Sequence, residues 1–157
     1  MKIRTLFLIT FLFIFISSFG QTKRDYERLI EKALKEWKKD NNISDTLIFN
    51  IIPETQDEFY KYYDLTNPNR GEEYHKMYSF LENQIYYKGI VELNNKKIIE
   101  KVILLAPYVD GEYAESYFDY LDFIVEKNNK IFCKLFKDIA EKEKRFESYF
   151  EEKCQNK

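Results

Sequence analysis

The stretch YERLIEKALKEW, residues 26–37, decides the fold class, because its apolar side chains repeat with the period of an α-helix. The apolar positions are Tyr26, Leu29, Ile30, Ala33, Leu34 and Trp37. This spacing collects them on one side of a helix and leaves charged residues on the other. Thr22 before the stretch and Asn41-Asn42 after it are residue types that start and end helices. The sequence therefore predicts an amphipathic helix that packs its apolar side against the rest of the protein.

Residues 1–20, upstream of this helix, have the features of a secretory signal peptide. In chain order these are a basic start, an apolar run of eleven residues and two small residues, provided by Lys2 and Arg4, LFLITFLFIFI at 6–16, and Ser18 and Gly20. A helix of that run, rising about 1.5 Å per residue, is too short to cross a hydrocarbon core of about 30 Å. We expect cleavage after Gly20, a periplasmic or secreted location and no stable membrane anchor, with an uncleaved anchor as the alternative.

Downstream, residues 21–157 read as a single helical domain. Thr55 and Glu58 have the capping-box spacing that starts a helix. Apolar spacing predicts further helices over 72–81, after Asp110-Gly111 and after Asn128-Asn129.

Two stretches leave alternatives open. Residues 45–52, DTLIFNII, fit either a buried strand or two turns of helix. Within 84–106, apolar pairs alternate with polar pairs and favour helix, whereas a minor β-hairpin turning at Asn94-Asn95 is the alternative. The predicted fold is mostly α, an antiparallel helical bundle or a short array of αα-hairpins, with that hairpin as a minor addition.

Two segments resemble exported, mostly helical proteins of Bacteroidetes-type bacteria. In FNIIPETQDEFYKYY, residues 49–63, an aromatic–apolar–Pro step precedes a capped helix with Glu58-Phe59 and a later Tyr63. The segment YVDGEYAESYFDYL, residues 108–121, resembles the start of a late helix in the same proteins. The resemblance implies export and a helical fold. It implies no catalytic residues, because those proteins have no assigned activity.

Composition excludes several classes of protein. The chain is 45% hydrophobic and 18% aromatic, with a formal net charge of −2, so it is neither disordered nor basic enough for a nucleic-acid partner. His75 is the only histidine, and with two cysteines it supplies too few ligands for zinc. The loop at 64–75 lacks the EF-hand oxygen and glycine positions, and no phosphate loop or nucleophile elbow occurs. We predict no catalytic residue of a recognised type, no metal site and no cofactor.

Five carboxylates recur at steps of three and four residues in the predicted helix after Gly111: Glu112, Glu115, Asp119, Asp122 and Glu126. On a helix this spacing forms one acidic stripe, in which like charges repel by a few tenths of a kcal/mol per pair. The stripe fits a solvated surface relieved by lysines of a neighbouring helix. It also fits a docking surface for a basic partner or for divalent cations.

Tyrosines are a second unusual feature, with 13 in the chain and clusters at Tyr60, Tyr62 and Tyr63 and at Tyr86 and Tyr87. A tyrosine packs an apolar ring and keeps a polar hydroxyl, which suits binding surfaces, including surfaces for glycans. The alternative is that these side chains fill the rim of the core.

Cys133 and Cys154 would meet an oxidising compartment after export. If residues 129–152 form one helix, the two Cα atoms lie about 31 Å apart, too far for a disulfide bond. No glycine or proline interrupts that segment. We therefore expect free or intermolecular thiols rather than an internal bridge.

Together these patterns favour an exported, non-enzymatic protein-interaction module of the immunity or inhibitor type. The acidic stripe would bind a basic protein, with Tyr60, Tyr62 and Tyr63 as a second candidate surface. The alternative is a carboxylate-dependent hydrolase or a glycan-binding protein that acts on cell-wall or polysaccharide substrates.

Overall fold

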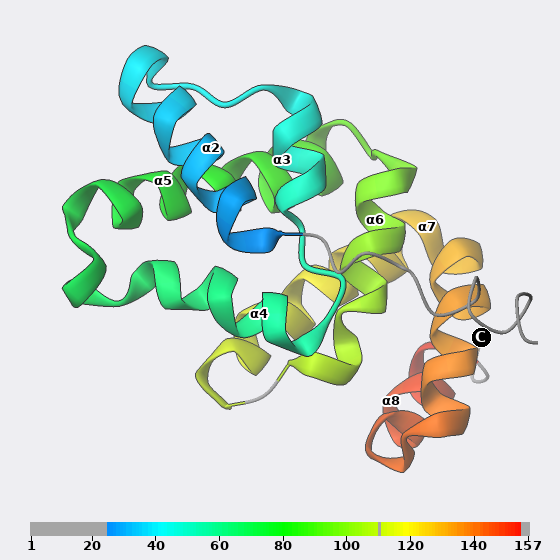
Figure 1. Ribbon diagram of the computed structural model, residues 1–157. Coiled ribbons are helices and arrows are strands. Elements are labelled where there is room, and N and C mark those ends of the chain that lie inside the picture. The colour runs from blue at the N-terminus through cyan, green and yellow to red at the C-terminus, as the bar shows by residue number, and fades with distance from the viewer. Residues whose placement is uncertain (1–24, 110, 155–157) are drawn as a thin grey trace, which may run out of the picture.

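The computed structural model describes residues 25–109 and 111–154, and every regular element within them is a helix (Figure 1). The α-helices are α2 (Tyr26–Asp40), α3 (Asp45–Ile51), α4 (Gln56–Tyr63), α5 (Glu72–Glu82), α6 (Lys96–Leu104), α7 (Ala114–Lys142) and α8 (Glu147–Cys154). The short helices are η1 (Asp64–Thr66), η2 (Pro68–Arg70), η3 (Asn83–Glu92), η4 (Ala106–Tyr108), η5 (Gly111–Tyr113) and η6 (Lys144–Phe146). The mostly-α prediction is confirmed, and the predicted signal peptide at 1–20 lies outside the described residues. Within those ranges, no helix has the length and apolar character needed to span a bilayer.

Polar side chains set both ends of α2. The Asp25 carboxylate accepts a hydrogen bond from the Arg28 N–H at 3.1 Å, which satisfies one of the free donors of the first turn. Asn41 ends the helix in the left-handed conformation and donates its N–H to the Trp37 carbonyl. Asp25 therefore caps α2, and Thr22, the predicted cap, lies outside the described residues.

The stretch DTLIFNII forms a helix, α3, which resolves the first open alternative. Its apolar residues Leu47, Ile48 and Ile51 are buried. The next helix, α4, begins at the predicted capping pair, where the Thr55 hydroxyl accepts from the Glu58 N–H at 3.3 Å. The Glu58 carboxylate accepts from the Glu54 N–H at 2.8 Å, so both groups satisfy free donors at the start of the helix.

The helix favoured for residues 84–106 is confirmed, since η3 and α6 form there, and the alternative β-hairpin is not present. η3 is a π-helix, and α6 follows it across a short link in which Asn94 has a positive φ of 49°. Asn95 caps α6 by accepting hydrogen bonds from the N–H groups of Lys97 and Ile98. The asparagine pair thus turns the chain between two packed helices, because both arms bury apolar side chains in the same core.

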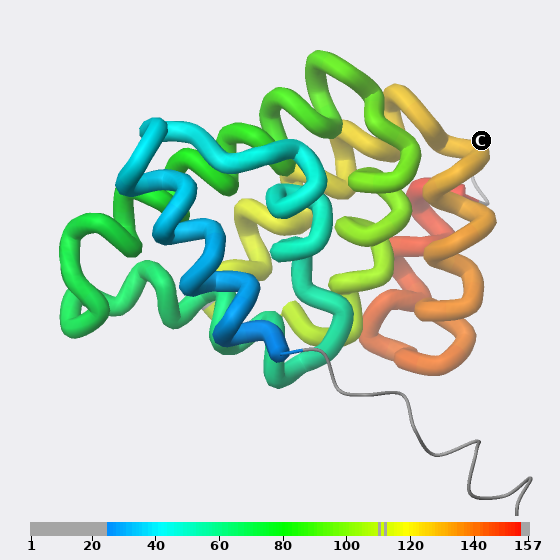
Figure 2. Tube along the Cα trace, turned by 45° about the horizontal axis from the view of Figure 1, so that its top comes forward, coloured from blue at the N-terminus to red at the C-terminus, as the bar shows by residue number. Residues whose placement is uncertain are grey.

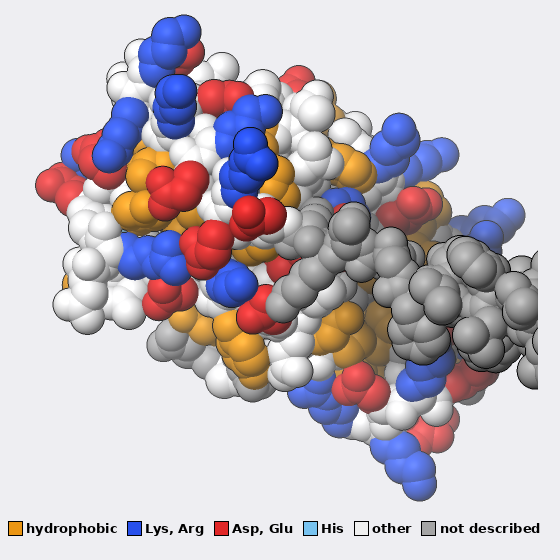
Figure 3. Space-filling model, in the orientation of Figure 1, with side chains coloured by type: hydrophobic (Ala, Val, Ile, Leu, Met, Phe, Trp, Pro, Cys, Tyr) orange, Lys and Arg blue, Asp and Glu red, His pale blue; other side chains and the backbone are white. Residues whose placement is uncertain are grey.

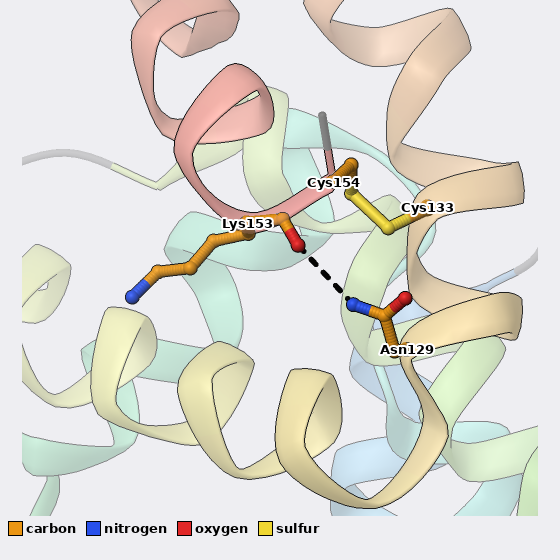
Figure 4. Close-up of a disulfide and its surroundings, with 4 residues drawn as sticks. All are labelled: Asn129, Cys133, Lys153 and Cys154. Carbon is orange, nitrogen blue, oxygen red and sulfur yellow. Dashed lines mark hydrogen bonds between the residues drawn. A yellow bond between two sulfur atoms is a disulfide. The ribbon is translucent and has the colours of Figure 1, made fainter. Parts of the chain in front are cut away.

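The C-terminal region confirms one expectation and corrects another. Asn128 has non-helical angles, φ −140° and ψ 41°, so α7 consists of two helices that meet at a kink, at the predicted asparagine pair. The chain then reverses after Lys142, and a disulfide joins Cys133 to Cys154 with Cα atoms 5.7 Å apart (Figure 4). The expectation of free thiols was wrong because it assumed one unbroken helix over 129–152.

Contacts with a distant segment hold this reversal in place. The Arg145 guanidinium donates to the Pro107 carbonyl at 2.6 Å and to the Val109 carbonyl at 3.3 Å. Next to it, Phe146 is only 4% exposed. Behind the turn, the Asn129 side chain donates to the Lys153 carbonyl at 3.2 Å, beside the disulfide (Figure 4).

One contiguous apolar core receives side chains from α2 through to η6. In Figure 2, α6 lies between the α2–α3 region and the second half of α7 with α8, which is drawn in orange and red at one end of the molecule. The first half of α7 packs on α6, since the buried Tyr117 hydroxyl donates to the Val102 carbonyl at 2.8 Å. This packing fixes which side of α7 faces solvent.

Candidate functional site

Helix α7 presents three of the five predicted stripe carboxylates to solvent, Glu115, Asp119 and Glu126. None of the three has an ion-pair partner among the described residues. Glu112 precedes α7 and belongs to η5, and its side chain is not among those described. Glu115, Asp119 and Glu126 are therefore not paired with lysines of the described residues, whereas Asp122 is.

Asp122 turns toward α8. It accepts a hydrogen bond from the Tyr149 hydroxyl at 2.7 Å and forms an ion pair with the Lys153 ammonium at 3.0 Å. Burial raises the pKa of the Tyr149 hydroxyl, and its hydrogen bond to Asp122 raises it further. Asp122 therefore holds α8 against α7. Unlike Glu115, Asp119 and Glu126, it is already engaged by side chains of α8.

An aromatic ring lies among the exposed carboxylates. Phe123 is 44% exposed, although its neighbours Leu121, Ile124 and Val125 are buried. A residue advances about 100° around a helix, so Phe123 shares its side of α7 with Asp119 and Glu126. We call Glu115, Asp119, Phe123 and Glu126 the α7 acidic face.

Basic side chains gather on a different helix. Lys32, Lys35, Lys38 and Lys39 of α2 are exposed, and blue side chains lie among red ones over the α2 region in the view of Figure 3.

The predicted tyrosine surface is mostly interior. Tyr62 is 2% exposed and Tyr63 is 7% exposed, so their rings cannot form a docking surface. Tyr60 is 48% exposed, and its hydroxyl accepts a hydrogen bond from the Gln56 amide at 3.2 Å. In the second predicted cluster, Tyr86 is buried and Tyr87 is 54% exposed.

The buried tyrosines surround a carboxylate, Glu82, at the end of α5. The Tyr62 hydroxyl donates to Glu82 Oε1 at 2.9 Å, and the Tyr78 hydroxyl also forms a hydrogen bond with this carboxylate. The residue keeps some exposure, but packed protein surrounds its carboxylate. Burial raises the pKa of Glu82 to about 7, because the desolvation of the anion outweighs the two hydrogen bonds that favour it.

Further rings complete this arrangement, which we call the tyrosine cluster. Its members are Tyr62, Tyr63, Tyr78, Tyr86, Tyr113 and Tyr120, contributed by α4, α5, η3, η5 and α7. The rings of Tyr63 and Tyr113 lie 3.8 Å apart between centroids, and those of Tyr86 and Tyr120 stack at 4.0 Å. Burial raises the pKa of Tyr62, Tyr63, Tyr78 and Tyr86, so their hydroxyls stay protonated as donors.

The sequence analysis did not identify Glu82 as a candidate residue, although the spacing of its neighbours indicates its surroundings. Tyr78, Glu82 and Tyr86 follow each other at steps of four residues, which places an acid between two tyrosines on one side of a helix. A carboxylic acid with a pKa near 7 has the proton affinity of a general acid. Glycoside hydrolysis needs a second carboxylate opposite, however, whereas burial raises the pKa of Glu82 and its hydrogen-bond partners are tyrosines.

In the described part of the chain, no group of three or more histidine, cysteine or acidic side chains could hold a metal ion. His75 is exposed on α5, and both cysteines are in the disulfide. Comparisons with models of protein families, with curated proteins and with solved structures return no match. The functional argument therefore rests on the α7 acidic face and on the geometry around it.

Proposed function

We propose that the protein is an exported, non-enzymatic binding module that docks a basic protein partner on the α7 acidic face. Its concrete form would be an immunity or inhibitor protein. The observation that carries this proposal is the 44% exposure of Phe123 beside carboxylates without an ion-pair partner in the described residues.

An exposed aromatic ring encircled by charge suits recognition of a protein. Buried aromatic anchors carry much of the binding energy in protein interfaces, and the surrounding groups exclude water. Carboxylates at the rim attract a basic partner and set its orientation, which affects the association rate more than the final affinity. Phe123 would then be the anchor, with Asp119 and Glu126 as the steering charges.

The helix that carries this face is firmly held. Tyr117 fixes its inner side to α6, and Asp122 together with the disulfide fixes α8 against it. A surface already ordered before binding loses less conformational entropy on association. The disulfide also fits export, because residues 1–20, if they act as a signal peptide, would direct the protein to an oxidising compartment.

Charge reversal tests the proposal. The triple variant Glu115→Lys/Asp119→Lys/Glu126→Lys inverts the face, and Glu100→Lys/Asp138→Lys/Glu147→Lys makes the same charge change at exposed positions elsewhere. Partners would be captured from periplasmic and culture-medium extracts of the source bacterium, identified by mass spectrometry, purified, and measured by calorimetry. Asp122 is left unchanged, because its replacement would also loosen α8.

We expect the wild type and the control triple to bind the same basic protein and the α7 triple to lose it. Phe123→Ala should weaken binding at least tenfold, as expected for an anchor residue. Thermal unfolding of all variants would check that each variant keeps the fold. A partner that binds the α7 triple as well as the wild type would refute the proposal, and so would equal loss in the control triple.

A further inference from the structure

A groove of about 360 Å³ lies between α3, η3 and the start of α6, away from the α7 acidic face and the tyrosine cluster. Its volume is at the lower end of the range for small-molecule sites. A protein partner would need about 800 Å² of surface on each side, far more than this hollow offers. The groove therefore has the dimensions of a site for a small, elongated molecule.

One wall of the groove is apolar. Ile48 and Phe49 of α3, Leu93 after η3 and Ile98 of α6 all line it. Leu93 is 63% exposed, the most exposed large apolar side chain among the described residues. Covering this wall would remove apolar surface from water, which favours an occupant with a hydrocarbon body.

The rest of the lining is polar and carries more positive than negative charge. Lys88 and Lys97 line the groove, and neither has an ion-pair partner within the described part of the chain. Asp45 is the one carboxylate of the lining, and Gln84 adds an amide. Two cations against one anion favour an anionic group on the occupant.

The backbone around the groove is unusual. η3 is a π-helix of ten residues, although π-helical geometry is rare and mostly limited to single turns near functional sites. Gly89 lets η3 approach α6, since a Cβ at this position would lie 2.8 Å from Ile98 Cδ1 and 3.1 Å from the Gln84 carbonyl oxygen. Both Gly89 and Ile98 line the groove, so this close approach shapes its wall.

We propose that this groove binds an aliphatic chain that ends in a carboxylate. The hydrocarbon lies against Phe49, Leu93 and Ile98, and the carboxylate is held by Lys88 and Lys97. This site is independent of the α7 acidic face, so its occupant and the basic protein partner bind at separate surfaces.

The experiment uses octanoate as the probe and 1-octanol as its uncharged match, with binding followed by amide chemical shifts in NMR titrations. Lys88→Glu/Lys97→Glu removes the cations, and Lys35→Glu/Lys38→Glu makes the same change on exposed lysines of α2. Thr46→Trp fills the groove from its exposed edge, and Asp45→Asn removes its only carboxylate.

We expect saturable octanoate binding whose shifts map to residues 45–49 and 88–98, at least tenfold tighter than binding of 1-octanol. The groove double variant should lose this preference, the α2 double variant should keep it, and Thr46→Trp should abolish both. Asp45→Asn should tighten octanoate about twofold or more, because it removes a repelling charge. Failure of the wild type to bind octanoate, shifts that map elsewhere, or weaker binding by Asp45→Asn would each overturn the proposal.

Discussion

Glu82 and Asp122 make the same hydrogen bond in two different regions. Each accepts from a tyrosine hydroxyl, Glu82 from Tyr62 at 2.9 Å and Asp122 from Tyr149 at 2.7 Å. Asp122 is 49% exposed and pairs with Lys153, whereas the groups that act on Glu82 include no cation. The two carboxylates therefore differ in their access to solvent and in the presence of a neighbouring cation, and not in their hydrogen bond to a tyrosine.

This difference assigns the two regions to different tasks. In the tyrosine cluster, a carboxylate and several hydroxyls satisfy one another in the interior, so a change there affects the stability of the whole fold. On α7, carboxylates stay hydrated, so a change there leaves stability almost constant and alters what the surface attracts. The following predictions test this division, beginning with the largest effect.

Removal of the buried carboxylate should have the largest effect. At pH 5, Glu82→Ala should lower the free energy of unfolding by about 3–4 kcal/mol, because it leaves two tyrosine hydroxyls without their acceptor and opens a cavity. Glu115→Ala on α7 should change it by no more than about 0.5 kcal/mol. Urea unfolding followed by circular dichroism measures both. Equal losses would show that the cluster has no special role in stability.

The pH dependence of stability should also follow Glu82. Its pKa is about 7 in the folded protein against a reference of 4.5, so the folded state binds more protons between these values than the unfolded state does. The contribution of Glu82 to the free energy of unfolding should therefore be highest below about pH 4.5. It should fall by up to about 3 kcal/mol as the pH rises past 7.

Urea unfolding between pH 5 and pH 8 measures this fall. The matched variant Glu82→Gln keeps an oxygen acceptor for Tyr62 but cannot ionise, so its stability should be nearly flat over that range. A wild-type profile as flat as that of the variant would mean that the carboxylate is better solvated than its surroundings indicate.

Loss of the disulfide should affect the other region. Cys133→Ser/Cys154→Ser should cost about 2–3 kcal/mol, as expected for a loop closed by residues 21 apart in sequence. Hydrogen exchange should show faster opening of α8 and of its bonds to Asp122, with protection of the tyrosine cluster nearly unchanged. Equal loss of protection in α5 would show that the two regions unfold as one unit.

The helical fold was predictable where the cause lies within a few residues. The apolar spacing of 26–37 predicted α2, and Thr55 with Glu58 predicted the start of α4. The reversal after Lys142 was not predictable in this way. It contains no glycine or proline, and it depends on Arg145 contacting carbonyl groups about 36 residues earlier.

The same distinction applies to the candidate sites. The spacing of Glu115, Asp119 and Glu126 along one helix was visible in the sequence, and the structure places all three on the exposed side of α7. Burial among side chains from several elements raises the pKa of Glu82, and no local pattern determines which of these elements meet. Asp122 looked like its neighbours in the stripe because its partners Tyr149 and Lys153 reach it only after the chain reverses.

The smallest effect should come from Asp122→Asn, which removes the charge that faces Lys153 and keeps an acceptor for Tyr149. Because this pair is half exposed, we expect a loss of about 0.5–1 kcal/mol that shrinks as salt is added. Glu82→Gln should have the opposite sign at pH 8, where it replaces a buried anion and should raise the free energy of unfolding. Urea unfolding of both variants at pH 8, at low and high salt, compares them directly. If both variants were destabilised at pH 8, the negative charge would be stabilising at both Glu82 and Asp122. Burial would then not distinguish the carboxylate of Glu82 from that of Asp122.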